Sequence, residues 1–167
     1  RTLQQKFPKS VYAENSLFTI GFIRFQNGEF KDAIVDYRNV LLVYKNSSLA
    51  PVVYYSIGDA YFNMEMYDSA IVNYQNVLTK YPSSDYVFDA VNGIQYSYVV
   101  MGKPESAVNL IDRFVGQNPN LKFSDQIYFK KGEIYYSQRD YQNAKISYQE
   151  FIAKYPKSNY VPEAYYW

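Results

Sequence analysis

Apolar side chains recur at intervals of three and four residues along much of the chain. In the first such segment they stand at Leu17, Ile20, Phe22 and Phe25, and the same spacing returns over residues 54–62. Residues three or four apart share one face of an α-helix, whereas a half-buried strand would alternate apolar and polar positions. The pattern therefore predicts amphipathic helices rather than strands.

This pattern repeats with a period of 37 residues. Four alanines mark the period at Ala33, Ala70, Ala107 and Ala144. A fixed period of about 20–50 residues is typical of solenoid proteins, in which each repeat buries its apolar face only against its neighbours. The sequence therefore predicts an all-α protein, an α-α superhelix or solenoid built from antiparallel helix hairpins.

Turn-forming residues divide each repeat into two helices. The turns inside the hairpins are predicted at Asn27-Gly28-Glu29, Glu65-Met66, Gly102-Lys103-Pro104 and Arg139-Asp140. The loops between hairpins carry proline and serine, as in Phe7-Pro8-Lys9-Ser10, Tyr81-Pro82-Ser83-Ser84 and Tyr155-Pro156-Lys157-Ser158. We expect each proline to end one helix and each serine to cap the next.

Small residues also keep the repeat register. Gly21, Gly58 and Gly132 each precede the marker alanine by twelve residues. We expect glycine and alanine to face each other across the hairpin, so that the two helix axes approach closely. Aromatic residues beside them would then fill the groove and contact the next hairpin.

The order of glycine, aromatic, alanine, tyrosine and proline over two helices resembles the tetratricopeptide repeat, whose usual length is about 34 residues. The loops beginning at Pro82 and Pro156 resemble those of bacterial cell-envelope members of this family, the outer-membrane-assembly lipoprotein and the Tol-Pal-associated periplasmic protein. We predict one array: residues 1–7 end a preceding repeat, residues 8–44, 45–81, 82–118 and 119–155 form four repeats, and residues 156–167 begin a fifth. This division implies that the sequence is part of a longer array.

The third and fourth repeats depart from the pattern. Gln95 replaces the glycine that precedes the marker alanine. Ile111 replaces the tyrosine that follows this alanine by four residues in the other repeats, at Tyr37, Tyr74 and Tyr148. Gly116 stands near the end of the second helix of the third repeat. We expect this repeat to pack less regularly. Lys131 occupies a position that is isoleucine in the other repeats, and we expect its amine to reach solvent while its stem stays packed.

Composition excludes several classes of function. The 17 basic and 16 acidic residues give a net charge of +1, and the nearest approach to a basic stripe is the single pair Lys130-Lys131, so a nucleic-acid site is not expected. The chain has no His and no Cys, which removes His-dependent triads, thiol chemistry and imidazole metal sites. Its carboxylates form no recognisable acid/base pair. We expect no enzymatic activity, cofactor or metal.

Function is therefore expected from surface recognition. In tetratricopeptide arrays the first helices of successive hairpins line a concave groove that binds peptides, which is what the resemblance implies here. The candidate groove residues are Asn15, Phe18, Phe22, Gln26, Val52, Tyr55, Asp59, Asn63, Asp89, Asn92, Tyr96, Gln126, Phe129, Lys130 and Glu133.

These candidates favour an apolar or amphipathic partner segment. The carboxylate clamp of chaperone-binding family members uses Lys and Asn, and the equivalent pairs here are Phe18 with Phe22 and Tyr55 with Asp59. Phe18 and Phe22 fit a core position as well as a groove position, whereas Tyr55 and Phe129 fit the groove better. An aromatic groove with amide and acidic rims suits apolar anchors that become desolvated on binding.

The leading hypothesis is a protein-protein interaction scaffold that binds a partner protein or peptide. The alternatives are a glycan-binding module that stacks sugar rings on aromatic platforms, and a structural spacer without an open groove. A glycan site predicts aromatics clustered in one pocket, whereas a peptide groove predicts aromatics spread over several repeats. The resemblance implies a periplasmic or outer-membrane-associated location, compatible with a lipid anchor on the parent protein, and a cytoplasmic location stays open. No segment is apolar and long enough to insert directly into a membrane.

Overall fold

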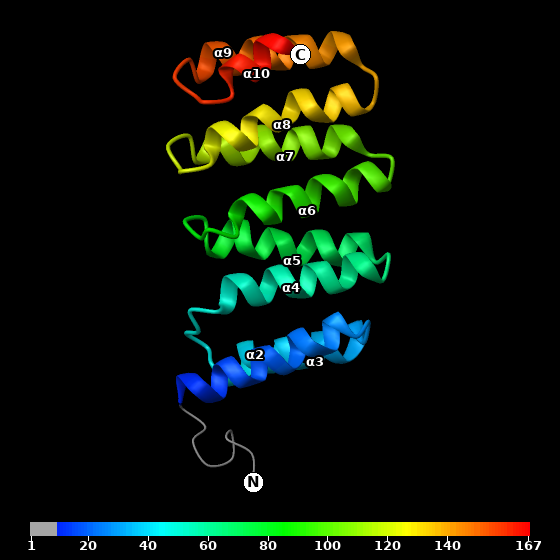
Figure 1. Ribbon diagram of the computed structural model, residues 1–167, viewed down its shortest axis with the longest axis vertical. Helices are drawn as coiled ribbons and strands as arrows, with labels where there is room; N and C mark the ends of the chain where they lie inside the picture. The colour runs from blue at the N-terminus through cyan, green and yellow to red at the C-terminus, as the bar shows by residue number, and fades with distance from the viewer. Residues whose placement is uncertain (1–9) are drawn as a thin grey trace. The chain divides into compact units, whose positions relative to one another are not determined.

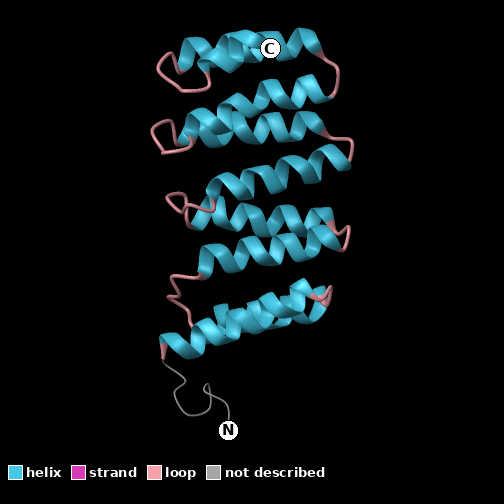
Figure 2. Cartoon of the chain, in the orientation of Figure 1, coloured by secondary structure: helices cyan, strands magenta, loops and turns pink. Residues whose placement is uncertain are grey.

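The computed structural model describes residues 10–167, which form nine α-helices and no strand (Figures 1 and 2). The helices are α2 (Val11–Gln26), α3 (Phe30–Val43), α4 (Ala50–Asn63), α5 (Tyr67–Lys80), α6 (Val87–Val100), α7 (Pro104–Gln117), α8 (Ser124–Ser137), α9 (Tyr141–Lys154) and α10 (Val161–Tyr166). Within the two units described below, α2 pairs with α3, α4 with α5 and α8 with α9 as antiparallel hairpins, which confirms the predicted fold class. The segment predicted to end a preceding repeat, residues 1–7, lies outside the described residues.

Helix positions follow the sequence period closely. The helices α4, α6, α8 and α10 begin at residues 50, 87, 124 and 161, which are 37 residues apart. The second helices α3, α5, α7 and α9 begin at residues 30, 67, 104 and 141, with the same spacing. Gly116 does not shorten α7, which has 14 residues like its counterparts.

The chain divides into two compact units, and the division falls within α6, between Ser97 and Tyr98. In unit 1 the α2–α3 and α4–α5 hairpins pack through α3 against α4, and most of α6 belongs to the same unit. In unit 2 the α8–α9 hairpin packs against α7 on one side and α10 on the other. Each unit has its own buried side chains.

Glycines on the first helices make room for tyrosine rings, not for the marker alanines as predicted. A Cβ atom on Gly58 would lie 2.5 Å from Cε1 of Tyr74, and one on Gly132 would lie 2.2 Å from Cε1 of Tyr148. These distances are far below van der Waals contact, so only glycine fits beside each ring. The alanines remain buried, but the close approach of the helices depends on Gly–Tyr packing.

Each hairpin turn contains one residue with a left-handed backbone. These residues are Gly28, Glu65, Gly102 and Arg139, with φ angles between 60° and 79°. The next residue donates its backbone N–H to a carbonyl oxygen five residues earlier, as from Met66 to Tyr61 at 2.9 Å. This geometry is the Schellman ending of a helix, which glycine adopts at the lowest steric cost.

Most of the loop serines accept a hydrogen bond from a backbone N–H that precedes the helix, not from the first turn of the helix as predicted. Ser10 is the N-cap of α2, and its hydroxyl accepts the backbone N–H of Tyr12. Ser47, Ser84 and Ser158 instead accept the backbone N–H two residues later, before the helix begins. They therefore stabilise the turn that leads into the helix and do not cap its first N–H groups.

Lys131 is buried in unit 2, at 7% exposure, so the prediction that its amine reaches solvent is wrong. Its Nζ lies 2.8 Å from Asp112 Oδ1 and 3.2 Å from Glu150 Oε2. The same Nζ lies 4.7 Å from the centre of the Tyr128 ring. Burial alone would lower the pKa of Lys131, but the hydrogen bond and charge of Asp112 raise it above its usual range. The charged amine of Lys131 is therefore buried in unit 2, where two carboxylates and a tyrosine ring surround it.

Candidate functional site

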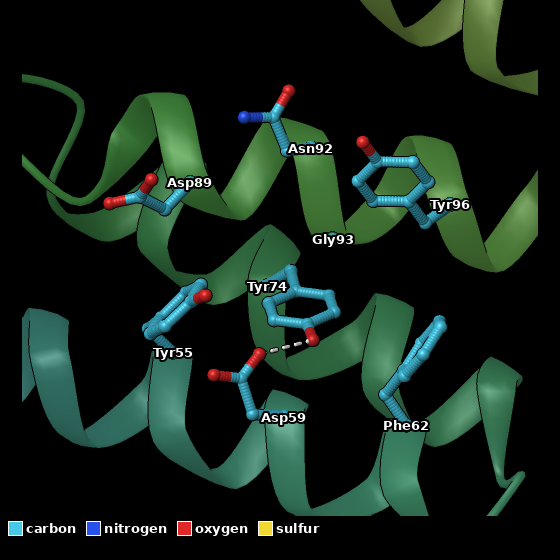
Figure 3. Close-up of a pocket in the computed structure, with 8 residues that line it drawn as sticks. All are labelled: Tyr55, Asp59, Phe62, Tyr74, Asp89, Asn92, Gly93 and Tyr96. Atoms are coloured by element: carbon cyan, nitrogen blue, oxygen red, sulfur yellow. Dashed lines mark hydrogen bonds between the residues drawn. The ribbon is translucent and has the colours of Figure 1, made fainter.

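First-helix side chains of unit 1 line two adjoining pockets. The acidic pocket, about 300 Å³ in volume, is lined by Tyr55, Asp59, Phe62, Tyr74, Asp89, Asn92, Gly93 and Tyr96 (Figure 3). The aromatic pocket, about 290 Å³, is lined by Phe18, Phe22, Phe25, Tyr37, Val52, Tyr55, Ser56, Asp59 and Tyr86. Tyr55 and Asp59 belong to both pockets, so the two adjoin at α4, and we refer to them together as the groove over α2, α4 and α6.

Tyr74 forms the floor of the acidic pocket. Its ring lies between α4 and α6, because a Cβ on Gly58 or on Gly93 would each come within 2.5 Å of a ring atom. Its hydroxyl donates a hydrogen bond of 2.7 Å to Oδ1 of Asp59, drawn as a dashed line in Figure 3. The two glycines therefore set the depth at which this tyrosine holds Asp59.

The carboxylate of Asp59 is the central polar group of the groove. Burial raises its pKa, hydrogen bonds from Tyr74 and Tyr55 lower it, and the charge of Asp89 raises it. The net direction is upward, so the tyrosine donors do not fully offset the loss of water. Burial also raises the pKa of Asp89. Among the described residues that line either pocket there is no lysine or arginine.

Aromatic rings pack against one another in two groups within the groove. The centre of the Phe18 ring lies 5.4 Å from that of Tyr37, and the Tyr55 ring lies 5.7 Å from Tyr74 and 5.8 Å from Tyr86. Such distances are typical of favourable aromatic pairs. Burial raises the pKa of Tyr37 to about 12.

Three aromatic side chains of the groove remain open to solvent, and one of them is Tyr86, which is 36% exposed. Phe22 on α2 is 47% exposed and Tyr96 on α6 is 57% exposed. Exposed aromatic side chains in a concave site are candidates for anchoring a partner, because they gain most from desolvation on binding.

The structure brings together eight of the predicted residues. Phe18, Phe22, Val52, Tyr55, Asp59, Asp89, Asn92 and Tyr96 line one or both pockets. Asn15, Gln26 and Asn63 are exposed and do not line either pocket. Asn63 instead donates its side-chain N–H to the backbone oxygen of Asp59, at 2.8 Å.

The predicted residues of unit 2 lie in a different environment. Phe129 is only 3% exposed, so it belongs to the core and offers no groove surface. Its ring packs 5.2 Å from Tyr148 and 5.3 Å from both Phe151 and Tyr160. Lys130 and Glu133 form an ion pair of 2.7 Å on α8, and Gln126 is half-buried on the same helix.

Several pocket residues were not among the predicted ones. They are Phe25, Tyr37, Ser56, Phe62, Tyr74, Tyr86 and Gly93. Gly93 could have been recognised from the sequence as an exceptional position, because the same repeat position holds Thr19, Ser56 and Lys130 in the other repeats. A glycine at that position leaves space beside Tyr74.

Over residues 10–167 no group of His, Cys, Asp and Glu side chains is arranged to hold a metal ion. In the same range, none of the helices has both the length and the apolar character that a membrane span requires.

Sequence-family comparison gives two matches. A family described as outer membrane lipoprotein (YfiO) matches residues 47–134, which is more than half of the chain. The tetratricopeptide repeat family matches residues 126–158. No curated protein matches the chain in sequence.

Solved structures share the fold. A tetratricopeptide repeat protein from Parabacteroides merdae superposes with a TM-score of 0.59 at 14% identity, over 96% of this chain and 59% of that one. The chain thus spans about three fifths of that protein. A structure of MamA gives a TM-score of 0.59 at 18% identity, over 92% of this chain and 85% of that one. These likenesses establish the repeat fold alone.

Proposed function

Since the chain belongs to the outer membrane lipoprotein family YfiO, we propose that it is a scaffold that binds an apolar or amphipathic segment of a partner protein. Tetratricopeptide repeats generally act as non-catalytic, protein-binding scaffolds. The observation that carries the finer proposal is the groove formed by the two adjoining pockets over α2, α4 and α6, with Phe22 and Tyr96 exposed within it.

The distribution of aromatics favours a peptide over a glycan as ligand. The rings extend over three helices and two pockets, from Phe18 on α2 to Tyr96 on α6. A sugar ring needs one compact platform, whereas an extended or helical peptide places anchors at several points along a groove. A spacer that only stacks its repeats would not need exposed aromatics in a concave site.

The family description supports a location at the outer membrane, and we infer that the chain lies on the periplasmic side of that membrane. We infer that the partner is another envelope protein. Cell fractionation of the parent organism, followed by immunodetection of the chain, would test this location.

The groove is tested with a phage-displayed library of random peptides selected against the chain. Affinities of the selected peptides are then measured by fluorescence anisotropy for the parent chain and for Phe22→Ser. We expect Phe22→Ser to weaken binding about five- to tenfold, because truncating an interface anchor costs about 1 kcal/mol or more. The side chain is already 47% exposed, so folding should change little.

Val72→Ser provides the matched control. Val72 lies on α5, is 57% exposed and lines neither pocket. Its substitution also removes an exposed apolar side chain, and we expect affinity to change less than about twofold because no interface contact is lost. The proposal is overturned if no peptide is enriched, or if both variants weaken binding equally. Enrichment on a glycan array with no peptide binding would favour the glycan alternative.

A further inference from the structure

The acidic pocket offers a ligand both negative charge and aromatic faces. Its carboxylates are Asp59 and Asp89, and its rings are Tyr55, Phe62, Tyr74 and Tyr96. Carboxylates with aromatic walls are the surroundings that cationic groups prefer, because the ring faces carry a negative electrostatic potential. Among the described residues lining this pocket no side chain is positively charged.

The negative charges of Asp59 and Asp89 both influence the titration of groups that line the acidic pocket. The charge of Asp89 raises the pKa of Asp59, and both charges raise the pKa of Tyr55 beyond the effect of burial. Asp59 is half-buried and Asp89 is exposed, so the charge of Asp89 makes the ionised form of Asp59 less favourable without forbidding it. A positive group in the pocket would relieve this repulsion.

We propose that the acidic pocket binds a basic side chain, arginine or lysine, of the partner segment whose apolar residues occupy the aromatic pocket. This proposal rests on the peptide groove described above and adds a requirement for its occupant. The planar guanidinium of arginine can stack on a ring while donating to carboxylates, and the ammonium of lysine offers charge in a smaller head. The recognised segment therefore combines apolar anchors with a basic residue.

The pocket is tested directly with N-acetyl-arginine amide, by two-dimensional NMR of the ¹⁵N-labelled chain. We expect saturable shifts at backbone amides of α4 and α6, with a Kd of about 1–10 mM, which suits a single small contact. N-acetyl-lysine amide should shift the same signals. N-acetyl-citrulline amide is a neutral counterpart of the arginine probe and should shift them far less.

Variants then assign the shifts to the carboxylates. The double variant Asp59→Asn, Asp89→Asn keeps the shape of both side chains, and the amide oxygen introduced by Asp59→Asn can still accept a hydrogen bond from Tyr74. We expect the double variant to weaken arginine binding at least about tenfold. The control Asp68→Asn removes an exposed carboxylate of α5 that lines neither pocket, and it should leave the titration unchanged.

The proposal is overturned if the arginine probe causes no saturable shifts, if citrulline shifts the signals equally, or if the double variant binds arginine as the parent does. These outcomes are separate from the library experiment. Selected peptides that depend on Phe22 while arginine fails to bind would leave the groove intact and remove only the basic requirement. Arginine binding without any selected peptide would instead remove the peptide groove.

Discussion

Asp59 shows how one side chain links packing with recognition. Its carboxylate accepts hydrogen bonds from buried tyrosines, yet its pKa lies above the ordinary value of 3.8 because burial outweighs those bonds. A neutral asparagine could accept the same bond from Tyr74 at lower desolvation cost. The charge therefore costs stability at neutral pH, which agrees with the binding role proposed for this carboxylate.

This balance predicts a pH-dependent effect of Asp59→Asn on folding. Since the folded-state pKa is raised, the aspartate contributes stability below its unfolded pKa, and this contribution is lost as pH rises through the folded pKa. We therefore expect Asp59→Asn to be more favourable, relative to the parent chain, at pH 7 than below pH 4. The measurement is the free energy of unfolding by urea at both pH values.

A difference between the variants that stays constant with pH would show that the carboxyl is not desolvated in the folded chain. Asp68→Asn is again the control, because this exposed carboxylate gives no reason to expect such a trend.

Two of the hairpin turns lower the stability of the fold through backbone strain. Gly28 and Gly102 adopt a left-handed conformation without strain, but Glu65 and Arg139 hold the same conformation with a side chain, at φ angles of 60° and 61°. A Cβ in this region crowds the adjacent backbone carbonyl, at a cost of about 1 kcal/mol. The Schellman bonds at the helix end offset this cost.

Glu65→Gly should therefore stabilise the chain by about 0.5–1 kcal/mol, with the gain limited by the greater freedom of glycine in the unfolded state. Thermal or urea unfolding followed by circular dichroism would measure this. The reverse substitution, Gly28→Ala, should destabilise by about the same amount, and no Cβ contact interferes because nothing lies within 4 Å. Destabilisation by Glu65→Gly would mean that the glutamate side chain makes a contact that outweighs its backbone strain.

Repeat periodicity made most of the helical architecture predictable. Turn residues in equivalent positions located every hairpin, and even the non-glycine turns at Glu65 and Arg139 followed the register. The partner of each glycine was not predicted correctly, because sequence spacing alone does not show that a tyrosine ring crosses the hairpin to reach it.

The site was only partly predictable for the same reason. Tyr55 and Phe129 occupy equivalent repeat positions, yet Tyr55 lines the groove and Phe129 is buried. Phe129 contacts Phe151, which stands where the two repeats that line the groove with Phe18 and Tyr55 have the smaller Val40 and Val77, whereas the third repeat has Phe114. Exposure at one position thus depends on the size of a residue on the other helix, which a pattern along a single helix does not reveal.

The chain as a whole has almost no net charge, at +1 from 17 basic and 16 acidic residues. Long-range attraction between the chain and a partner should therefore be weak, and charge should act mainly inside the acidic pocket. The charges of the pocket should therefore affect the affinity of the complex more than the rate of association.

For a selected peptide with a basic residue, we expect an association rate constant of about 10⁵–10⁷ M⁻¹s⁻¹ that changes little with added salt, because no strong field steers the encounter. Stopped-flow fluorescence at low and high ionic strength would measure it. A steep fall of the association rate with salt would contradict this and indicate an extended charged surface.

Equal spacing of helix starts also bears on how the gene can vary. Any rearrangement that removes or adds a segment of one repeat length joins a helix to its own counterpart, since first helices and second helices share the 37-residue interval. Such an event preserves reading frame, helical phase and turn geometry at once, whereas a slightly shorter deletion would rotate the later side chains of the joined helix about its axis. Natural variants of this chain should therefore differ in length by whole repeats, with point substitutions left to determine what each copy recognises.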